Sequence, residues 1–225
     1  MNLEALFIGS IGVLAETSDI QRRAYNQALT EAGVDWHWDA ETYRDLLARS
    51  GGRARLTELS EASDARLSDA DIERIHARKT EIACDEIVDR GVSLRPGVAR
   101  LVSEALHRGI KLALVTTTQR TNIDAIAAAA GSDLPLPDFS AVLTVNDVNR
   151  PKPAPDVYRL ALQTLGVSKD AAIAIEDSAA SVASSRATGI YTIATPGDFT
   201  SGQDFGNADR VLESLEEFSL DSPRG

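Results

Sequence analysis

The segment Leu3-Glu4-Ala5-Leu6-Phe7-Ile8-Gly9-Ser10-Ile11-Gly12, at residues 3–12, decides how this chain folds. Its first six residues form an apolar run with a single charge, which is typical of a parallel strand buried on both faces. Two glycines then interrupt the run, so we expect the strand to end at Ile8. The segment is either a glycine loop that holds a phosphate or a catalytic loop that has lost its acids.

Beyond residue 91 the sequence alternates between helical patterns and short apolar runs. Helices are predicted at 96–107, 122–130, 155–165 and 179–187, and strands at 110–115, 141–145, 172–175 and 191–194. Strands that alternate with helices at this spacing indicate a parallel sheet with helices on both faces. The first strand must join that sheet, so the predicted class is α/β with a Rossmann-like core.

The stretch between the first strand and residue 91 has a helical pattern and no strand. Three helices follow from their boundary signals: one ends at Gly33, one is capped by Asp39, and a long amphipathic one is capped by Ser68. We therefore expect two domains, namely a helical cap at 17–90 and an α/β core formed by 1–16 and 91–225.

Composition excludes several classes of protein. The 225 residues carry a net charge of -11, whereas a nucleic-acid partner requires a basic face, so no nucleic-acid role is expected. The single cysteine, Cys84, fits a reducing compartment and is interpreted as an inert, buried thiol. The sequence contains no apolar run of about 18 residues and no basic leader, so we expect a cytoplasmic protein without a membrane partner.

The carboxyl ends of parallel strands are where ligands bind, so the residues that follow each strand are candidate site residues. Thr116 and Thr117 precede a helix and offer hydroxyl and N–H groups to a phosphate, although plain helix capping would explain them too. Lys152 lies between two prolines on a stiff segment, which favours binding of an anion by its ammonium group. A solvated lysine in a polar loop is the alternative. Glu176 and Asp177 provide the oxygen ligands that Mg²⁺ prefers, with helix capping as the alternative.

Several further motifs have the same order and spacing as in a known family. They are Arg22-Arg23-Ala24-Tyr25-Asn26, Gly33-Val34-Asp35-Trp36-His37-Trp38-Asp39, Ser50-Gly51-Gly52, Leu94-Arg95-Pro96-Gly97, Thr116-Thr117-Thr118, Lys152-Pro153-Ala154-Pro155, Glu176-Asp177-Ser178 and Pro196-Gly197-Asp198-Phe199. Over nearly its whole length the chain resembles the haloacid dehalogenase superfamily of phosphohydrolases. Within it, the chain is similar to CbbY-type sugar-phosphate phosphatases, including the branch specific for xylulose 1,5-bisphosphate.

The resemblance implies a Mg²⁺ cofactor, a phosphorylated small-molecule partner and roles for individual residues. Thr116, Thr117 and Lys152 would bind phosphate, and Glu176 and Asp177 would bind the metal. Glu16 would touch the substrate from the cap linker. Arg53 would meet a distal phosphate from the cap, with solvent exposure as the alternative.

The family's first motif, Asp-x-Asp-Gly-Val-Leu, is degenerate in this chain. Gly12-Val13-Leu14 fixes the frame, so the two aspartate positions fall on Gly9 and Ile11. In the family the first aspartate is the nucleophile and a Mg²⁺ ligand, and the second is the general acid/base. Neither glycine nor isoleucine can do this chemistry. Ser10 between them is expected to point to the opposite face of an extended segment.

The loss of these carboxylates changes the expected electrostatics. Because one metal ligand is missing, we expect weak or absent Mg²⁺ binding at Glu176 and Asp177. A direct ion pair between Lys152 and Asp177 is expected in place of the metal.

Three functions are consistent with these observations. The leading one is a catalytically impaired pseudoenzyme that still binds a phosphosugar or phosphate. The second is an active Mg²⁺-dependent sugar-phosphate phosphatase with a substitute nucleophile. The third is a non-catalytic regulatory or scaffold protein.

Overall fold

A six-stranded parallel sheet forms the core of the computed structural model, which describes residues 3–48, 51–63 and 66–224. The strand order is β3-β2-β1-β4-β5-β6, with β1 at Ala5–Ile8, β2 at Lys111–Val115, β3 at Ala141–Leu143, β4 at Ala172–Glu176, β5 at Tyr191–Ala194 and β6 at Arg210–Val211. The predicted α/β class is confirmed. The sequence did not predict β6, because a strand of two residues has no periodicity to detect.

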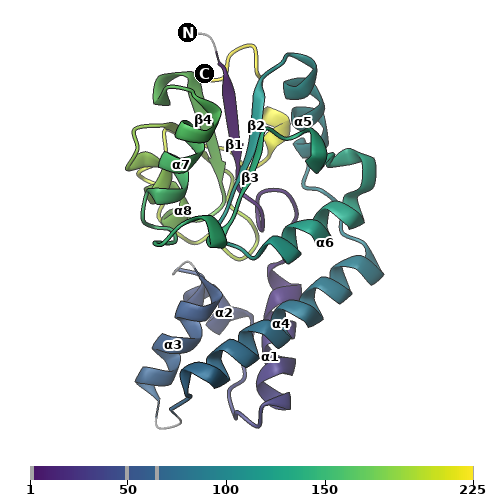
Figure 1. The fold of residues 1–225 in the computed structure, drawn as a ribbon, viewed down its shortest axis with the longest axis vertical. Coiled ribbons are helices and arrows are strands. Elements are labelled where there is room, and N and C mark those ends of the chain that lie inside the picture. Colours follow the sequence, from purple (N-terminus) through teal and green to yellow (C-terminus); the bar gives the residue numbers. More distant parts are fainter. Residues whose placement is uncertain (1–2, 49–50, 64–65, 225) are drawn as a thin grey trace.

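Helices cover both faces of the sheet (Figure 1). Leu6 and Ile8 of β1 face the helices α5 (Val98–His107) and α6 (Arg120–Ala130). Ala5 and Phe7 point the other way and pack against α7 (Asp156–Leu165), which lies beside α8 (Ala179–Arg186). Side chains of a strand alternate between faces, so a strand buried on both faces must be apolar throughout. This is why residues 5–8 contain no polar side chain.

The register of β1 brings the candidate site residues to one edge of the sheet. Ile8, the last residue of β1, is paired with Leu114 of β2 and Ile175 of β4. The residues that follow these three strands are therefore neighbours, although more than 100 positions separate the first strand from the second in the sequence. Ligand sites of parallel sheets form at this edge.

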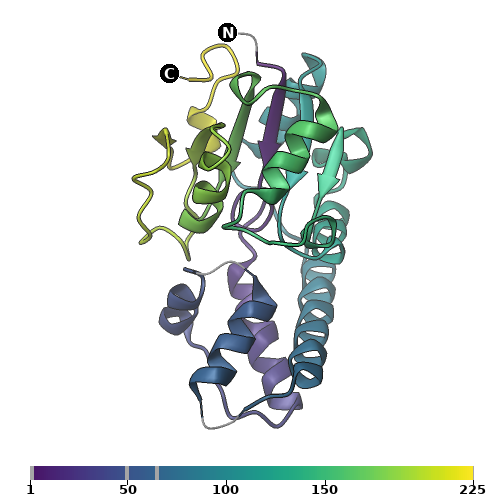
Figure 2. The ribbon, with the colours of Figure 1, turned by 60° about the vertical axis from the view of Figure 1, so that its left-hand side comes forward.

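The helical cap lies beyond this edge and is inserted between β1 and α5 (Figures 1 and 2). It consists of α1 (Ser18–Glu31), α2 (Ala40–Leu46), α3 (Gly52–Ala62) and α4 (Asp69–Arg90). Asp39 caps α2 by accepting a bond from the Thr42 amide at 2.8 Å, and Ser68 caps α4 in a capping box with Asp71. Helix α3 was not predicted, because Gly51-Gly52 were interpreted only as a helix break. Ser50, which precedes them, lies outside the described residues.

The centre of the cap is aromatic, with the ring centroids of Tyr25 and Trp38 4.6 Å apart. Two contacts hold the cap over the core. In the first, the C-terminal half of α4 packs against α6 of the core (Figure 1). At the linker, the Arg95 guanidinium donates to the carbonyl oxygens of Gly12, Thr195 and Pro196. This clamp fixes the loop after β1 against the loop after β5.

None of the helices within the described ranges is long and apolar enough to cross a membrane.

Candidate active-site cleft

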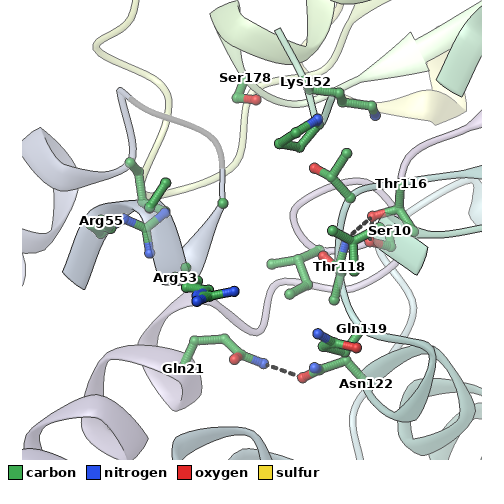
Figure 3. A pocket seen from close by; sticks show the side chains of 18 of the residues that line it. Ser10, Gln21, Arg53, Arg55, Thr116, Thr118, Gln119, Asn122, Lys152 and Ser178 are labelled. Atoms are coloured by element: carbon green, nitrogen blue, oxygen red, sulfur yellow. Dashed lines mark hydrogen bonds between the residues drawn. The ribbon is translucent and has the colours of Figure 1, made fainter. Parts of the chain in front are cut away.

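A cleft of about 830 Å³ lies between the cap and the carboxyl edge of the sheet. Most of the candidate residues from the sequence line it: Ile11, Arg53, Thr116, Thr117, Lys152, Glu176 and Asp177. Figure 3 shows Arg53 and Arg55 on the cap side and Ser10, Thr116 and Lys152 on the core side. The volume falls in the range of small-molecule sites, about 300–1,000 Å³.

Gly9 lies at the end of β1, and its neighbours leave no room for a side chain. Its amide donates to the Ile175 carbonyl at 3.0 Å. A Cβ added at Gly9 would lie 2.5 Å from Glu176 Oε2 and 2.9 Å from Val13 Cγ2. The space that an aspartate at this position would need is therefore filled by the Glu176 carboxylate. The loop therefore has no carboxylate at Gly9, and the carboxylate that lies beside this position belongs to Glu176.

Gly12 is required by the turn that follows. Its φ is +79°, in the left-handed region, and an added Cβ would lie 2.6 Å from Asp177 Cγ. Only glycine combines this conformation with such a close approach. Gly12 therefore brings the loop backbone against Asp177 and holds no phosphate by itself.

The prediction that Ser10 points away from the site is wrong. Ser10 lines the cleft, and its hydroxyl lies 2.8 Å from the hydroxyl of Thr116. Thr116 in turn accepts a bond from the Thr118 amide at 3.1 Å. The strand ends at Ile8 and the chain turns at Ser10, whose carbonyl accepts from the Leu14 amide at 2.7 Å, so strand alternation no longer applies there.

The predicted ion pair between Lys152 and Asp177 is also wrong. The Lys152 ammonium pairs with Glu176, and it donates a second bond to the Val115 carbonyl at 2.8 Å. The Tyr158 hydroxyl donates to the same Glu176 oxygen. The side chains of Lys152 and Glu176 are 3% and 2% exposed, so this is a buried pair. Glu176 has the same parity as Ala172 and Ala174 along β4, so it faces α7, where Tyr158 lies.

Asp177 forms no ion pair with any of the residues that the structure describes. Burial raises the pKa of its carboxyl to about 8, and the negative charge of Glu176 adds to this effect while Lys152 partly offsets it. Both effects favour the protonated form of this carboxyl near neutral pH in the unligated protein. The pair Glu176-Asp177 therefore has one negative charge, which Lys152 balances.

The residues at this edge do not fit Mg²⁺, the cofactor that the resemblance implies. Within the described residues there is no group of three or more Asp, Glu, His or Cys side chains that could hold a metal ion. Of the two carboxylates, Glu176 is committed to Lys152 and Tyr158, so only Asp177 remains to offer a carboxylate to the cleft. A metal that prefers six oxygen ligands would have to displace the ammonium first.

The cap contributes a cluster of cations that the sequence reasoning found only in part. Arg53 is half exposed and pairs with Glu73 at 3.5 Å. Arg55 is 7% exposed and lies over the Tyr43 ring, 5.5 Å from its centroid. Lys79 is 6% exposed and lies over the Tyr25 ring, 4.8 Å from its centroid. All three line the cleft.

Lys79 is the unusual member of this cluster. Burial lowers the pKa of its ammonium to about 7, with a further contribution from Arg55. No described residue gives it an ion pair or a hydrogen bond. His76 beside it also has a lowered pKa, about 4, because of its burial and the charge of Lys79. A buried cation without a counterion is costly, so a negatively charged ligand would stabilise this wall.

A signal for Lys79 was present in the sequence. Ile72, Ile75, Lys79, Ala83 and Ile87 follow one another at intervals of three or four, and all of them are buried along α4. A lysine on the apolar stripe of an amphipathic helix is a candidate ligand contact, because lysine is almost never buried without a partner. Ser18, Gln21 and Tyr25 repeat the pattern on α1 and face the cleft.

Glu16 is the one predicted substrate contact that lies away from the cleft lining. Its carboxylate accepts bonds from the amides of Ser18 and Asp198, both at 3.0 Å. Gly197 allows this approach, because a side chain there would overlap the carboxylate. In this structure Glu16 ties the cap linker to the loop after β5.

The fold and the cleft define a haloacid dehalogenase-like hydrolase, and the chain belongs to this family, whose model matches residues 6–189. Within the family the chain is 42% identical over 215 residues to protein CbbY of Rhodobacter capsulatus, covering 96% of this chain and 95% of that protein. It is 31% identical over 176 residues to hexitol phosphatase A of Escherichia coli K12, covering 78% of each.

Solved structures of CbbY from Rhodobacter sphaeroides agree with this assignment. The complex with phosphate superposes with a TM-score of 0.92 at 36% identity, over 98% of this chain and 99% of that one. A mutant in complex with xylulose-(1,5)bisphosphate gives a TM-score of 0.93 at the same identity and coverage.

Proposed function

We propose that this protein binds a sugar bisphosphate in the cleft without hydrolysing it. The observation that supports this most is at the end of β1, where Gly9 and Ile11 occupy the two positions of the family's acids. A nucleophile must be a side chain with a lone pair to attack phosphorus, and a general acid must release a proton. Neither residue has such a group, and Glu176 fills the space beside Gly9.

Binding is favoured by groups on both walls of the cleft. On the core side, the hydroxyls of Ser10 and Thr116 and the N–H groups that begin α6 suit a phosphate. On the cap side, Arg53 and Lys79 suit a second one, and Lys79 lacks a counterion among the described residues. Two anionic ends joined by a short carbon chain would match this arrangement, which agrees with the bisphosphate in the related CbbY complex.

Mg²⁺ has no place in this proposal. The Lys152 ammonium neutralises Glu176 in place of a metal, and it is fixed by this pair and by its bond to the Val115 carbonyl. We propose the division into a core of residues 1–16 and 91–225 and a cap of residues 17–90, with the ligand between them. A cytoplasmic location stays a prediction.

One observation favours the second candidate, a phosphatase with a substitute nucleophile. The Ser10 hydroxyl points into the cleft beside Thr116. Its only hydrogen-bond partner among the described side chains is that hydroxyl, and no histidine or carboxylate is in place to remove its proton. A serine without a base is a weak nucleophile, so this candidate ranks second.

The test combines calorimetry with phosphate release. The protein is titrated with pentulose 1,5-bisphosphates and with monophosphates, with and without Mg²⁺, and released phosphate is measured over hours. We expect micromolar binding of a bisphosphate, no dependence on Mg²⁺ and no turnover. Robust turnover that Asp177→Ala or Ser10→Ala abolishes would establish the phosphatase instead. Absence of binding to every phosphorylated compound would favour a scaffold.

A further inference from the structure

Two neutral amides meet at the boundary between cap and core. Gln21 comes from α1 of the cap and Asn122 from α6 of the core, and both line the cleft. The Gln21 Nε2 atom donates to Asn122 Oδ1 at 3.0 Å (Figure 3). Each residue is only 2% exposed. The pair is therefore a fixed part of the site and not a surface contact.

The pair leaves two hydrogen-bonding positions open. Gln21 Oε1 is buried and has no hydrogen-bond partner in the part of the chain that the structure describes. Asn122 Nδ2 donates to none of the described residues, but it is not fully buried and is accessible from the cleft. Buried polar side-chain atoms are nearly always paired with protein or ordered water, so Gln21 Oε1 calls for a partner, and the amide group of Asn122 beside it can donate to the same partner. One position is an acceptor and the other is a donor.

The chemistry of these positions selects the partner. A phosphate dianion has only acceptors and cannot satisfy Gln21 Oε1, while a methylene group satisfies neither position. A hydroxyl group both donates and accepts. We propose that Gln21 and Asn122 bind a hydroxyl group on the carbon chain of the ligand, so that this pair selects a hydroxylated bisphosphate over a plain one.

The place of the pair in the cleft agrees with this role. Figure 3 shows Gln21 next to Arg53 of the cap and Asn122 next to Gln119, which precedes α6. In the proposed function, on which this inference rests, the anionic ends of the ligand bind to hydroxyl and N–H groups of the core and to Arg53 and Lys79 of the cap. A neutral pair that lines the same cleft is suited to the uncharged carbon chain of that molecule.

A competing explanation is that the pair serves only to latch the cap onto the core. In that case Gln21 Oε1 would need no ligand, and the loss of the bond would weaken every ligand equally. The hydroxyl subsite predicts a different result, because only ligands that carry the hydroxyl would lose affinity. The two explanations are separated by comparing two ligands of the same length and charge.

The experiment is calorimetric titration with a pentulose 1,5-bisphosphate and with pentane-1,5-diol bisphosphate, which has the same two phosphates and no free hydroxyl. The unaltered protein should bind the pentulose compound about tenfold more tightly, the size expected for one or two hydrogen bonds. In Gln21→Met, the two affinities should become equal, by weakening of the pentulose compound alone. Gln27→Met is the matched control, because Gln27 is on the same helix and exposed, with its amide donating to Glu31.

Each result decides something. Equal affinity of the unaltered protein for both compounds would overturn the hydroxyl subsite and leave the proposed function intact, and this comparison does not depend on any variant folding. Preference for the pentulose compound that survives Gln21→Met would also overturn the assignment, as would equal weakening of both compounds. Binding of neither compound would overturn the proposed function together with the subsite.

Discussion

The buried pair of Lys152 and Glu176 makes the sharpest prediction about stability. Lys152→Met keeps the length of the side chain and removes its charge, so Glu176 stays buried with only the Tyr158 hydroxyl as a partner. Solvent screening does not reduce the effect, because both side chains are at most 3% exposed. Breaking a buried pair on one side costs about 3–5 kcal/mol, and the lost bond to the Val115 carbonyl adds about 1 kcal/mol. The remaining bond from Tyr158 offsets a similar amount, so we expect the free energy of unfolding to fall by about 4 kcal/mol.

Urea unfolding followed by circular dichroism at pH 7 measures this value. Lys169→Met is the matched control, because Lys169 pairs with Asp170 at 2.7 Å while both side chains are at least half exposed. Such a pair contributes at most about 1 kcal/mol. The double variant Lys152→Met/Glu176→Gln should recover part of the loss, because it no longer buries an unpaired charge. The reasoning is refuted if Lys152→Met costs less than about 1 kcal/mol, or if the double variant loses the sum of the two single losses.

Three further predictions concern Lys79, the Gly9 and Ile11 positions, and Gly12. For Lys79, whose pKa is lowered to about 7, the unfolded chain binds more protons than the folded chain between pH 7 and 10, so stability rises with pH in that window. Urea unfolding at pH 7 should therefore show that Lys79→Met stabilises the protein by on the order of 3 kcal/mol. Calorimetry should show that the same variant binds a bisphosphate more weakly. Unchanged stability would contradict the burial of a charge at Lys79. Gly9→Asp/Ile11→Asp should lower the melting temperature, because the new Cβ at position 9 would lie 2.5 Å from Glu176 Oε2. Mg²⁺ should raise the melting temperature of this variant and not that of the natural chain. Gly12→Ala should lower the free energy of unfolding more than Gly33→Ala does. Both glycines have positive φ, which costs about 1–2 kcal/mol for alanine, but only Gly12 has Asp177 against its Cβ position. Equal losses of stability would show that this contact is loose.

The sequence predicted the architecture because its signals are local. The apolar run before Gly9 and the alternation after Gly91 define the strands, and Asp39 and Ser68 cap their helices as their residue types indicate. Residues that follow parallel strands must meet at one edge, so the lining of the cleft by Thr116 and Glu176 could be expected from the strand positions alone.

Some of the site could not be predicted, because direction and partner depend on the turn and on neighbouring elements. Ser10 enters the cleft because the chain turns immediately after β1. Arg55 and Gln21 belong to helices whose cleft-facing sides become defined only when the cap packs over the core. Sequence spacing gives the side of a helix but not what lies opposite to it.

The sequence alone determined that Gly9 and Ile11, where the family resemblance predicts acids, have no carboxylate, because no fold can supply a side chain that the chain lacks. The consequence of that absence was decided only by the tertiary structure. Glu176 occupies the space beside Gly9 and takes Lys152 as its partner, since it ends β4 on the side that faces Tyr158, whereas Asp177, one residue further, does not. Ion pairing between buried groups depends on distances of a few ångströms and on shared burial, and those are set by the packing of α7 against the sheet.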